Sequence, residues 1–229
     1  MNAPEERVSR ITPAIEDYLK AIYILQQHEE LVTTSMLGER KGSKPGSVTG
    51  MIKKLAEMNL VLHMPYQGVQ LTEAGEKIAL EVIRHHRLLE LYLVESLGYT
   101  WDEVHDEAER LEHHISEKLE ARIAARLGNP NFDPHGDPIP ALDGALQSIH
   151  TTSIADMPIA SQVRVVRVGD QKAEHLRYLA DMGLTPGALV EVVDSAPFDG
   201  PLSIRVDTVA RVLDRRMART IHVEPLYSK

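Results

Sequence analysis

Histidine and acidic side chains gather in the middle of the chain at spacings that could bind a metal ion. Five of the 11 histidines lie between residues 85 and 114. If residues 101–127 are helical, four side chains project into one sector about 100° wide. These four are His105, Glu109, Glu112 and His113. A preceding helix carries His86 and Glu90 at an i,i+4 spacing, which places both on one face.

Imidazole nitrogens and carboxylate oxygens together form a ligand set for a divalent transition metal. This mixture suits Mn²⁺, Fe²⁺, Co²⁺ or Zn²⁺, and the chain has no cysteine to supply a soft thiolate. An N-terminal helix adds Asp17, with Glu16 as an alternative donor. Residues 76–150 hold 15 acidic and seven basic residues, which agrees with a cation site but also with a solvated acidic surface. His85 is rotated by about 100° from His86 around the helix, and His114 by the same angle from His113, so both are expected outside the site.

A basic strip near the N-terminus has the character of a DNA-binding surface. Five basic residues and no acidic residue lie between positions 40 and 56. Short hydroxyl side chains accompany them at the start of the expected recognition helix. The predicted DNA-contacting residues are Lys44, Pro45, Ser47, Thr49, Lys53 and Lys54. The same pattern also fits a three-helix domain with a solvated lysine face, and winged helices serve as protein-binding modules as well.

The elements around these residues are mainly helical, followed by a β-rich C-terminal part. Apolar periodicity predicts helices at 13–28, 33–40 and 45–56, then a β-hairpin in which Leu60, Leu62 and Met64 alternate. Residues 76–127 read as helices, 129–144 as irregular, and a linker extends to about 155. The last 75 residues form short β-branched runs interrupted by one helix at 170–183.

This order of elements predicts three domains. Residues 1–75 form a winged helix-turn-helix DNA-binding domain, 76–150 a helical domain that carries the candidate metal ligands, and 151–229 a small, partly open β-barrel. The net charge of −9 divides into −1, −8 and 0 over these three parts, so the DNA-binding part is not itself strongly acidic.

Composition excludes several classes of protein. Without cysteine the chain has no disulfide framework and no cysteine nucleophile. It contains no apolar run long enough to span a membrane, and the charged segment MNAPEERVSR lacks a signal-peptide core, so we expect a cytoplasmic protein. Aromatic residues make up only 4%, which disfavours a single-strand binder that stacks bases.

Several segments resemble the diphtheria toxin repressor family of metal-dependent regulators, in its manganese transport regulator branch. They are TPAIEDYLKAIYIL at 12–25, KPGSVTGMIKKL at 44–55, LTEAGEKIA at 71–79, HRLLELYL at 86–93, VHDEAERLEHHIS at 104–116 and GDPIPALDG at 136–144. The C-terminal part is similar to an iron-transport-associated SH3-like domain through LADMGLTPGALVEV at 179–192.

The resemblance implies a homodimer in which metal binding controls DNA binding. It makes 76–150 the metal-binding and dimerisation domain and 151–229 the SH3-like domain. Asp17, His86, Glu109, Glu112 and His113 fall on metal-ligand positions of the family, and His86, Glu90 and His105 fall on an ancillary site. Asp17 and Glu109 are hard oxygen donors where iron-type members have Met and Cys, which favours Mn²⁺. Lys20 replaces a carboxylate of the manganese type, which argues against a two-metal cluster of that type. In the SH3-like domain Lys172 cannot ligate, whereas Glu174 and His175 can.

We therefore predict a metal-dependent transcriptional repressor that binds a palindromic double-stranded operator as a dimer when loaded with Mn²⁺ or Fe²⁺. Zn²⁺, Co²⁺ or Cd²⁺ can occupy the site in vitro. We expect no membrane partner, no small organic substrate and no enzymatic activity. The alternatives are a metalloenzyme, for which we find no HExxH motif or phosphate loop, and a winged-helix regulator without a metal site.

Overall fold

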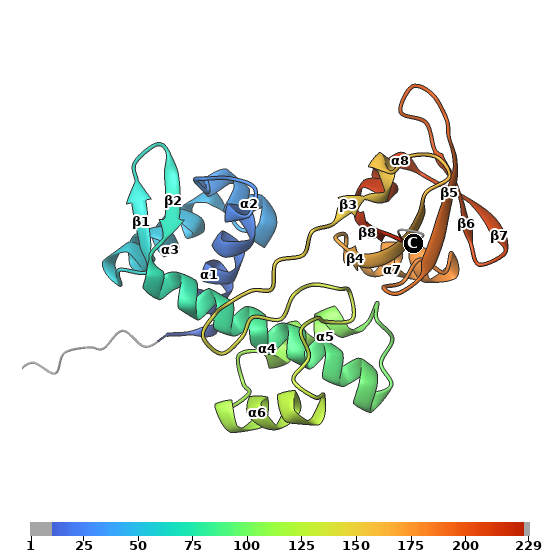
Figure 1. The fold of residues 1–229 in the computed structure, drawn as a ribbon. Helices are drawn as coiled ribbons and strands as arrows, with labels where there is room; N and C mark the ends of the chain where they lie inside the picture. Colours follow the sequence, from blue (N-terminus) through green and yellow to red (C-terminus); the bar gives the residue numbers. More distant parts are fainter. Residues whose placement is uncertain (1–10, 227–229) are drawn as a thin grey trace, which may run out of the picture. The chain divides into compact units, whose positions relative to one another are not determined.

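The computed structural model describes residues 11–226, so the charged N-terminal decapeptide lies outside the described residues (Figure 1). Two compact units make up the chain. One comprises the residues up to His85 together with Pro140–Ala145, and the other comprises His86–Ile139 with Leu146 to the C-terminus. The predicted division into three domains remains a prediction.

The first unit is a winged helix-turn-helix. Its elements are α1 (Pro13–Gln26), α2 (Thr34–Lys41), α3 (Pro45–Glu57), β1 (Val61–Met64), β2 (Gly68–Leu71) and the first half of α4 (Glu73–Leu97). The Thr33 hydroxyl caps α2 by accepting the N–H of Met36, and Pro45 occupies the first turn of α3, where its missing N–H costs nothing. Strands β1 and β2 pair antiparallel as the wing.

The apolar periodicity of this unit fills one core. Ile15, Leu19 and Ile22 of α1 are fully buried, and Val48 and Leu55 of α3 pack in the same cluster. The wing differs from the predicted alternation, because Val61 is buried whereas Leu62 is 56% exposed. Within β1 only Val61 is buried, and Leu62 and His63 are both exposed. The sequence alone leaves open which side of a short strand faces the core.

The second unit begins within α4 and contains α5 (Val104–Leu111) and α6 (Glu117–Arg126). The predicted helical run over 101–127 is wrong in its continuity, because residues 112–116 interrupt it. Ser116 caps α6 by accepting the N–H of Leu119, and such a cap competes with continuation of the preceding helix.

The C-terminal part of this unit is an antiparallel sheet with a small core. Its elements are β3 (Thr152–Ser153), the 3₁₀ turn η1 (Ile154–Asp156), β4 (Gln162–Val168), α7 (Ala173–Asp181), β5 (Leu189–Ser195), β6 (Leu202–Val206), β7 (Val209–Leu213), α8 (Arg215–Arg219) and β8 (Ile221–Pro225). The strand order is β3-β8-β4-β5-β6-β7, and the short helix α8 was not predicted. The SH3-like, mainly α with β fold class is confirmed.

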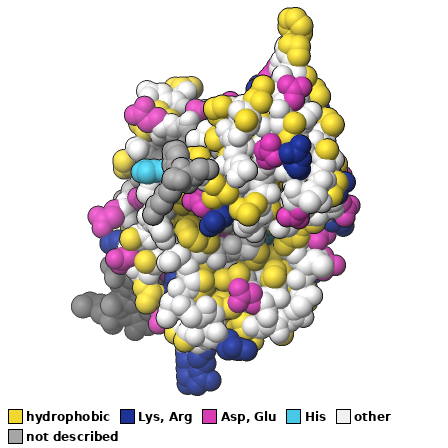
Figure 2. Space-filling view, turned by 45° about the vertical axis from the view of Figure 1, so that its right-hand side comes forward, with side chains coloured by type: hydrophobic (Ala, Val, Ile, Leu, Met, Phe, Trp, Pro, Cys, Tyr) yellow, Lys and Arg dark blue, Asp and Glu magenta, His cyan; other side chains and the backbone are white. Residues whose placement is uncertain are grey.

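One third of the 15 acidic residues in the segment 76–150 lie inside the protein. Five acidic side chains of this segment are buried: Glu90, Glu112, Glu120, Asp133 and Asp137. On the face shown in Figure 2, acidic side chains are scattered singly among apolar and uncharged ones. Buried carboxylates require positive or hydrogen-bonding partners, so each of these five residues must be paired inside the protein.

Candidate metal centre

Helices α4 and α5 bring three predicted ligands into contact. On α4, Nε2 of His86 lies 2.9 Å from Oε1 of Glu90, as the i,i+4 spacing predicts. From α5, Nδ1 of His105 lies 3.2 Å from Oε1 of Glu90 and 3.2 Å from Nε2 of His86. The two imidazole rings meet edge to face with centroids 4.9 Å apart. The three side chains of the predicted ancillary site therefore lie in direct contact with one another.

The remaining donors of the segment approach the other side of the His86 ring. Nδ1 of His86 lies 2.6 Å from Oε2 of Glu112 and 4.0 Å from Oε1 of Glu109. Nε2 of His113 lies 3.4 Å from Oε1 of Glu112. Helix α5 ends at Leu111, yet the N–H of Glu112 still donates to the Ala108 carbonyl, so Glu112 keeps the direction that a further helical turn gives it.

The electrostatics of the cluster hold a carboxylate ionised in the interior. Glu90 is 1% exposed, and burial would raise its pKa. The imidazoles of His86, His105 and His135 outweigh that effect and keep the pKa of Glu90 well below its ordinary value. A buried carboxylate surrounded by imidazole nitrogens is a donor set suited to a divalent first-row metal. The chemistry of these residues therefore fits such an ion.

A third group of potential ligands was not predicted. Asp133 and His135 lie in the irregular segment after α6, and both are buried beside Glu90. Burial and the charge of Glu90 raise the pKa of Asp133 to about 8. Burial would lower the pKa of His135, but Glu90 and Asp133 outweigh it and raise that pKa to about 9. The only signal in the sequence was the pairing of acid and histidine within the loop segment NPNFDPHGDPIP.

Asp17, the predicted ligand from the N-terminal helix, lies on α1 in the first compact unit. There its Oδ2 accepts from Nζ of Lys41 at 3.0 Å. Its place in a metal site remains a prediction. Lys20, on the same helix, is 8% exposed.

The predicted ligands of the C-terminal domain, Glu174 and His175, lie in the first turn of α7 and form a small polar group with Asp170. His175 Nδ1 lies 2.7 Å from Oδ2 of Asp170, and its Nε2 lies 3.9 Å from Glu174. The structure thus joins His175 to Asp170, which the sequence reading did not consider.

The predicted DNA-contacting residues share one exposed face of α3 and its start. All six are exposed, whereas Val48, Ile52 and Leu55 of the same helix are buried; the six are Lys44, Pro45, Ser47, Thr49, Lys53 and Lys54. The Thr49 hydroxyl donates to the Pro45 carbonyl at 3.0 Å and retains its acceptor lone pairs. From Lys44 to Lys54 the face carries basic side chains and no acidic one, as phosphate contact requires, and the exposed Glu57 stands at the far end of α3.

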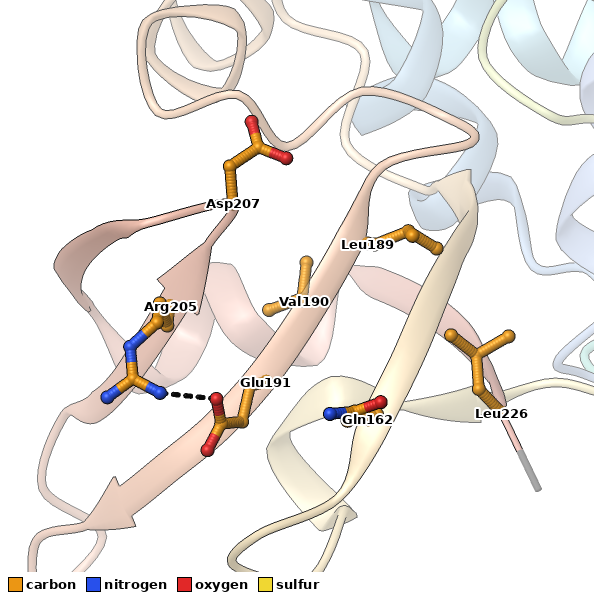
Figure 3. A pocket seen from close by; sticks show the side chains of 7 residues that line it. All are labelled: Gln162, Leu189, Val190, Glu191, Arg205, Asp207 and Leu226. Carbon is orange, nitrogen blue, oxygen red and sulfur yellow. Dashed lines mark hydrogen bonds and ion pairs between the residues drawn. The ribbon is translucent and has the colours of Figure 1, made fainter. Parts of the chain in front are cut away.

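A cavity in the C-terminal sheet offers a different kind of surface. Figure 3 shows its lining: Gln162, Leu189, Val190, Glu191, Arg205, Asp207 and Leu226. Arg205 and Glu191, opposite one another on β6 and β5, form an ion pair within this lining. The lining has no histidine and one of its two carboxylates is already paired, so it does not supply a metal-ligand set.

Three family models together cover most of the chain. The "Iron dependent repressor, N-terminal DNA binding domain" matches residues 10–69, the "Iron dependent repressor, metal binding and dimerisation domain" matches 72–141, and the "FeoA domain" matches 152–225. Among curated proteins, the "Iron-dependent repressor IdeR" of Mycobacterium leprae is 30% identical over 223 residues, covering 91% of this chain and 96% of that protein. The chain belongs to the diphtheria toxin repressor family of metal-dependent regulators.

Solved structures agree with this membership of the diphtheria toxin repressor family. A "Manganese-dependent transcriptional repressor complex with manganese" has a TM-score of 0.84 and 40% identity, covering 93% of this chain and all of the other. ScaR with bound Cd²⁺ has a TM-score of 0.79 and 33% identity, covering 93% and 99%. The chain is accordingly a DNA-binding, metal-dependent transcriptional regulator by family, and neither predicted alternative is favoured.

The family model for metal binding and dimerisation spans the whole cluster of donors on α4 and α5, and it extends to Asp133 and His135. The model for DNA binding spans α3 with its exposed basic face. Within the described residues, no helix has both the length and the apolar character needed to cross a membrane.

Proposed function

We propose that this family member is a repressor of metal-uptake genes, activated by Mn²⁺ or Fe²⁺, which binds a palindromic operator as a homodimer. The observation that carries the proposal is the buried contact of His86 with Glu90, His105 and Glu112. An apolar core would stabilise the fold at least as well as these buried imidazole and carboxylate groups do, so stability alone does not account for them. They are in place to bind a cation.

Two sets of residues would hold metal. Asp17, His86, Glu109, Glu112 and His113 form the proposed primary site, and His86, Glu90 and His105 form the proposed ancillary site. A bound divalent ion would neutralise carboxylates that otherwise repel one another. Since the donors include α1 of the DNA-binding unit, metal affinity and DNA affinity are coupled, and each ligand strengthens the other by the same factor.

The residues of α3 would then read the operator. Lys44, Lys53 and Lys54 bind phosphates and set the dependence on salt, whereas Pro45, Ser47 and Thr49 approach bases or the nearest phosphates. Two such helices in a symmetric dimer meet half-sites separated by a whole number of helical turns. We also expect a cytoplasmic location, because the operator DNA is there, and no catalytic activity.

The relatives support manganese as an activator. One solved relative is a manganese-dependent repressor with manganese, and ScaR has been solved with Cd²⁺ and with Zn²⁺. IdeR proteins are iron-dependent repressors. The hard oxygen donors Asp17 and Glu109 favour Mn²⁺ over softer ions, although Zn²⁺ has the higher intrinsic affinity for a site of this kind.

The test is selection of duplex DNA from a random pool by the full-length protein, once with Mn²⁺ and once with a chelator. The proposal predicts enrichment of a palindrome only with Mn²⁺, and release of that duplex when the chelator is added. Equal enrichment under both conditions would show a regulator without metal control, and no enrichment under either would contradict the proposed repressor.

A further inference from the structure

An ion pair inside the first compact unit occupies the carboxylate that the proposed primary metal site needs. Nζ of Lys41, in the last turn of α2, lies 3.0 Å from Oδ2 of Asp17 on α1. Lys41 belongs to the basic strip between positions 40 and 56, but it is not among the residues proposed to contact DNA. Its charge lies against α1 instead.

The pair depends on the packing of two helices. Asp17 and Lys41 are 24 positions apart in the sequence, so no spacing within one helix brings them together. Their side chains are 28% and 26% exposed, which places the contact partly inside the unit. Within residues 11–226, Asp17 is the only hydrogen-bond or ion-pair partner of the Lys41 ammonium.

The main chain at Lys41 is held in place, whereas the ammonium is at the end of a flexible stem. Gly42 ends α2 in the left-handed conformation, with a φ of +58°, and its N–H donates to the Glu39 carbonyl. The Ser43 hydroxyl donates to the Lys41 carbonyl at 3.3 Å. Four methylene groups separate this anchored backbone from the ammonium. The ammonium can therefore change partners while α2 and the start of α3 stay where they are.

Lys41 and a divalent ion would compete for the single negative charge of Asp17. Two cations that share one carboxylate stand close enough to repel each other, and a partly buried position screens this repulsion less than bulk water does. Ion pairs that remain partly exposed are weak. Asp17 would therefore release Lys41 readily in exchange for a doubly charged ion that other ligands also hold.

A released Lys41 ammonium would lie beside the proposed DNA-contacting face. Only two residues separate Lys41 from Lys44, the first exposed residue of that face. In a helix-turn-helix the first helix crosses the DNA backbone while the second enters the major groove. A lysine at the junction of the two helices is thereby placed next to phosphates.

We propose that Lys41 and a divalent ion exchange places on Asp17. Without metal, Asp17 holds Lys41; when Asp17 ligates the ion, the Lys41 ammonium turns to a DNA phosphate. The inference rests on the proposed function, because it takes Asp17 as a metal ligand and α3 as the recognition helix. Lys41 thus raises the metal concentration needed for activation, and DNA that binds Lys41 strengthens metal binding by the same factor.

The first measurement asks whether the pair stabilises the metal-free, full-length protein. Urea unfolding is compared for Asp17→Asn, for Lys41→Met, which keeps an apolar stem, and for the double variant. The double variant should lose less stability than the sum of the two single losses, because each single change already breaks the pair. Additive losses would show that the two side chains do not interact in solution and would overturn the proposal.

The second measurement is the affinity for Mn²⁺ alone, by calorimetry. Lys41→Met should bind Mn²⁺ about 2–5-fold more tightly than wild type, because the competing cation is gone. Lys41→Arg retains the charge and should restore the wild-type affinity. The matched control is Lys77→Met, since Lys77 pairs with Glu73 at 2.8 Å on the exposed surface of α4. Weaker or unchanged Mn²⁺ binding by Lys41→Met would overturn the exchange, and weaker binding would show that Lys41 orients Asp17 for the ion.

The third measurement is the salt dependence of DNA binding. With saturating Mn²⁺, Lys41→Met should lower the slope of log affinity against log salt by about one, and in metal-free protein it should leave the slope unchanged. An equal decrease in both states, or none in either, would overturn the exchange. If the wild type shows no Mn²⁺-dependent DNA binding, the proposed function fails. If the wild type responds to Mn²⁺ and Lys41→Met behaves identically, only the role of Lys41 fails.

Discussion

Nδ1 of His86, on α4, lies 2.6 Å from Oε2 of Glu112, the residue that follows the last turn of α5. Both residues are buried, at 5% and 1% exposure. The contact joins two helices through groups that can bind the same ion. A change in the charge of Glu112 would therefore alter the proposed metal site without removing apolar packing.

Replacing Glu112 with Gln should abolish the response to metal. The amide keeps the size of the side chain but loses the anionic donor, so the coupling of metal to DNA binding, about 5–150-fold, should fall to none. His113→Ala should act in the same way. Fluorescence anisotropy of the selected duplex across an Mn²⁺ titration measures this. Asp106→Asn, on an exposed position of α5, is the control. If the Glu112→Gln variant responded to Mn²⁺ as the wild type does, Glu112 would not be a metal ligand.

Replacing Lys53 with Ala should weaken binding to every DNA sequence alike. A lysine that contacts phosphate releases about one counterion on binding, so the slope of log affinity against log salt should fall by about one. Lys118→Ala, an exposed lysine on α6, should leave the slope unchanged. If Lys53→Ala changed sequence preference at a constant slope, the residue would be contacting bases instead.

Exchanging two hard donors for soft ones should change the preferred activator. The double variant Asp17→Met, Glu109→Cys should respond to Fe²⁺ at lower concentration than to Mn²⁺, because thioether and thiolate ligands favour softer ions. The wild-type protein should respond to Mn²⁺, with Zn²⁺ bound tightly but activating less well. Anaerobic titrations of DNA binding with each metal give the order. If the order in which the metals activate DNA binding were unchanged in the double variant, other residues would determine the metal preference.

Lys20 should limit the number of ions at the primary site. A charged lysine cannot ligate, and Lys20→Glu would supply a carboxylate on the face of α1 that also carries Asp17. We expect this variant to bind one more Mn²⁺ per chain than wild type, measured by calorimetry. A wild-type protein that already holds a tight Mn²⁺ pair at Glu109 and Glu112 would contradict this role of Lys20.

The loop that follows α6 should tolerate no side chain at Gly136. This glycine has a φ of +86°, and a Cβ there would lie 2.0 Å from the Val166 carbonyl oxygen. Gly136→Ala should cost about 1–3 kcal/mol in the free energy of unfolding from the backbone conformation alone. Gly50→Ala, where a Cβ meets nothing within 4 Å, should instead stabilise α3 by about 0.5–1 kcal/mol. Urea unfolding of both variants checks the pair, and equal stabilities would contradict the close approach.

Periodicity identified the helices and the hairpin of the first unit because these elements are specified by neighbours in sequence. Val48, Ile52 and Leu55 recur at helical spacing and are buried, which leaves Ser47, Thr49 and Lys53 exposed as predicted. The pairing of His86 with Glu90 was equally local. The break after Leu111 was missed because the apolar and polar pattern continues through it, and only the capping hydroxyl of Ser116 marks the new start.

The sequence by itself determined the ligand types, the helical faces that present them and the basic face of α3, since each of these depends on spacing within one element. Only the tertiary structure decided which elements meet. Asp133 and His135 follow no periodic pattern, and their direction is set by backbone amides of their own loop, by the Trp101 carbonyl and by the close approach to β4. Glu90 was expected to serve one site, and folding places its second oxygen against residues more than 40 positions away. Spacing within a helix determines which face of the helix carries a side chain. Contacts between distant segments depend on how the whole unit packs.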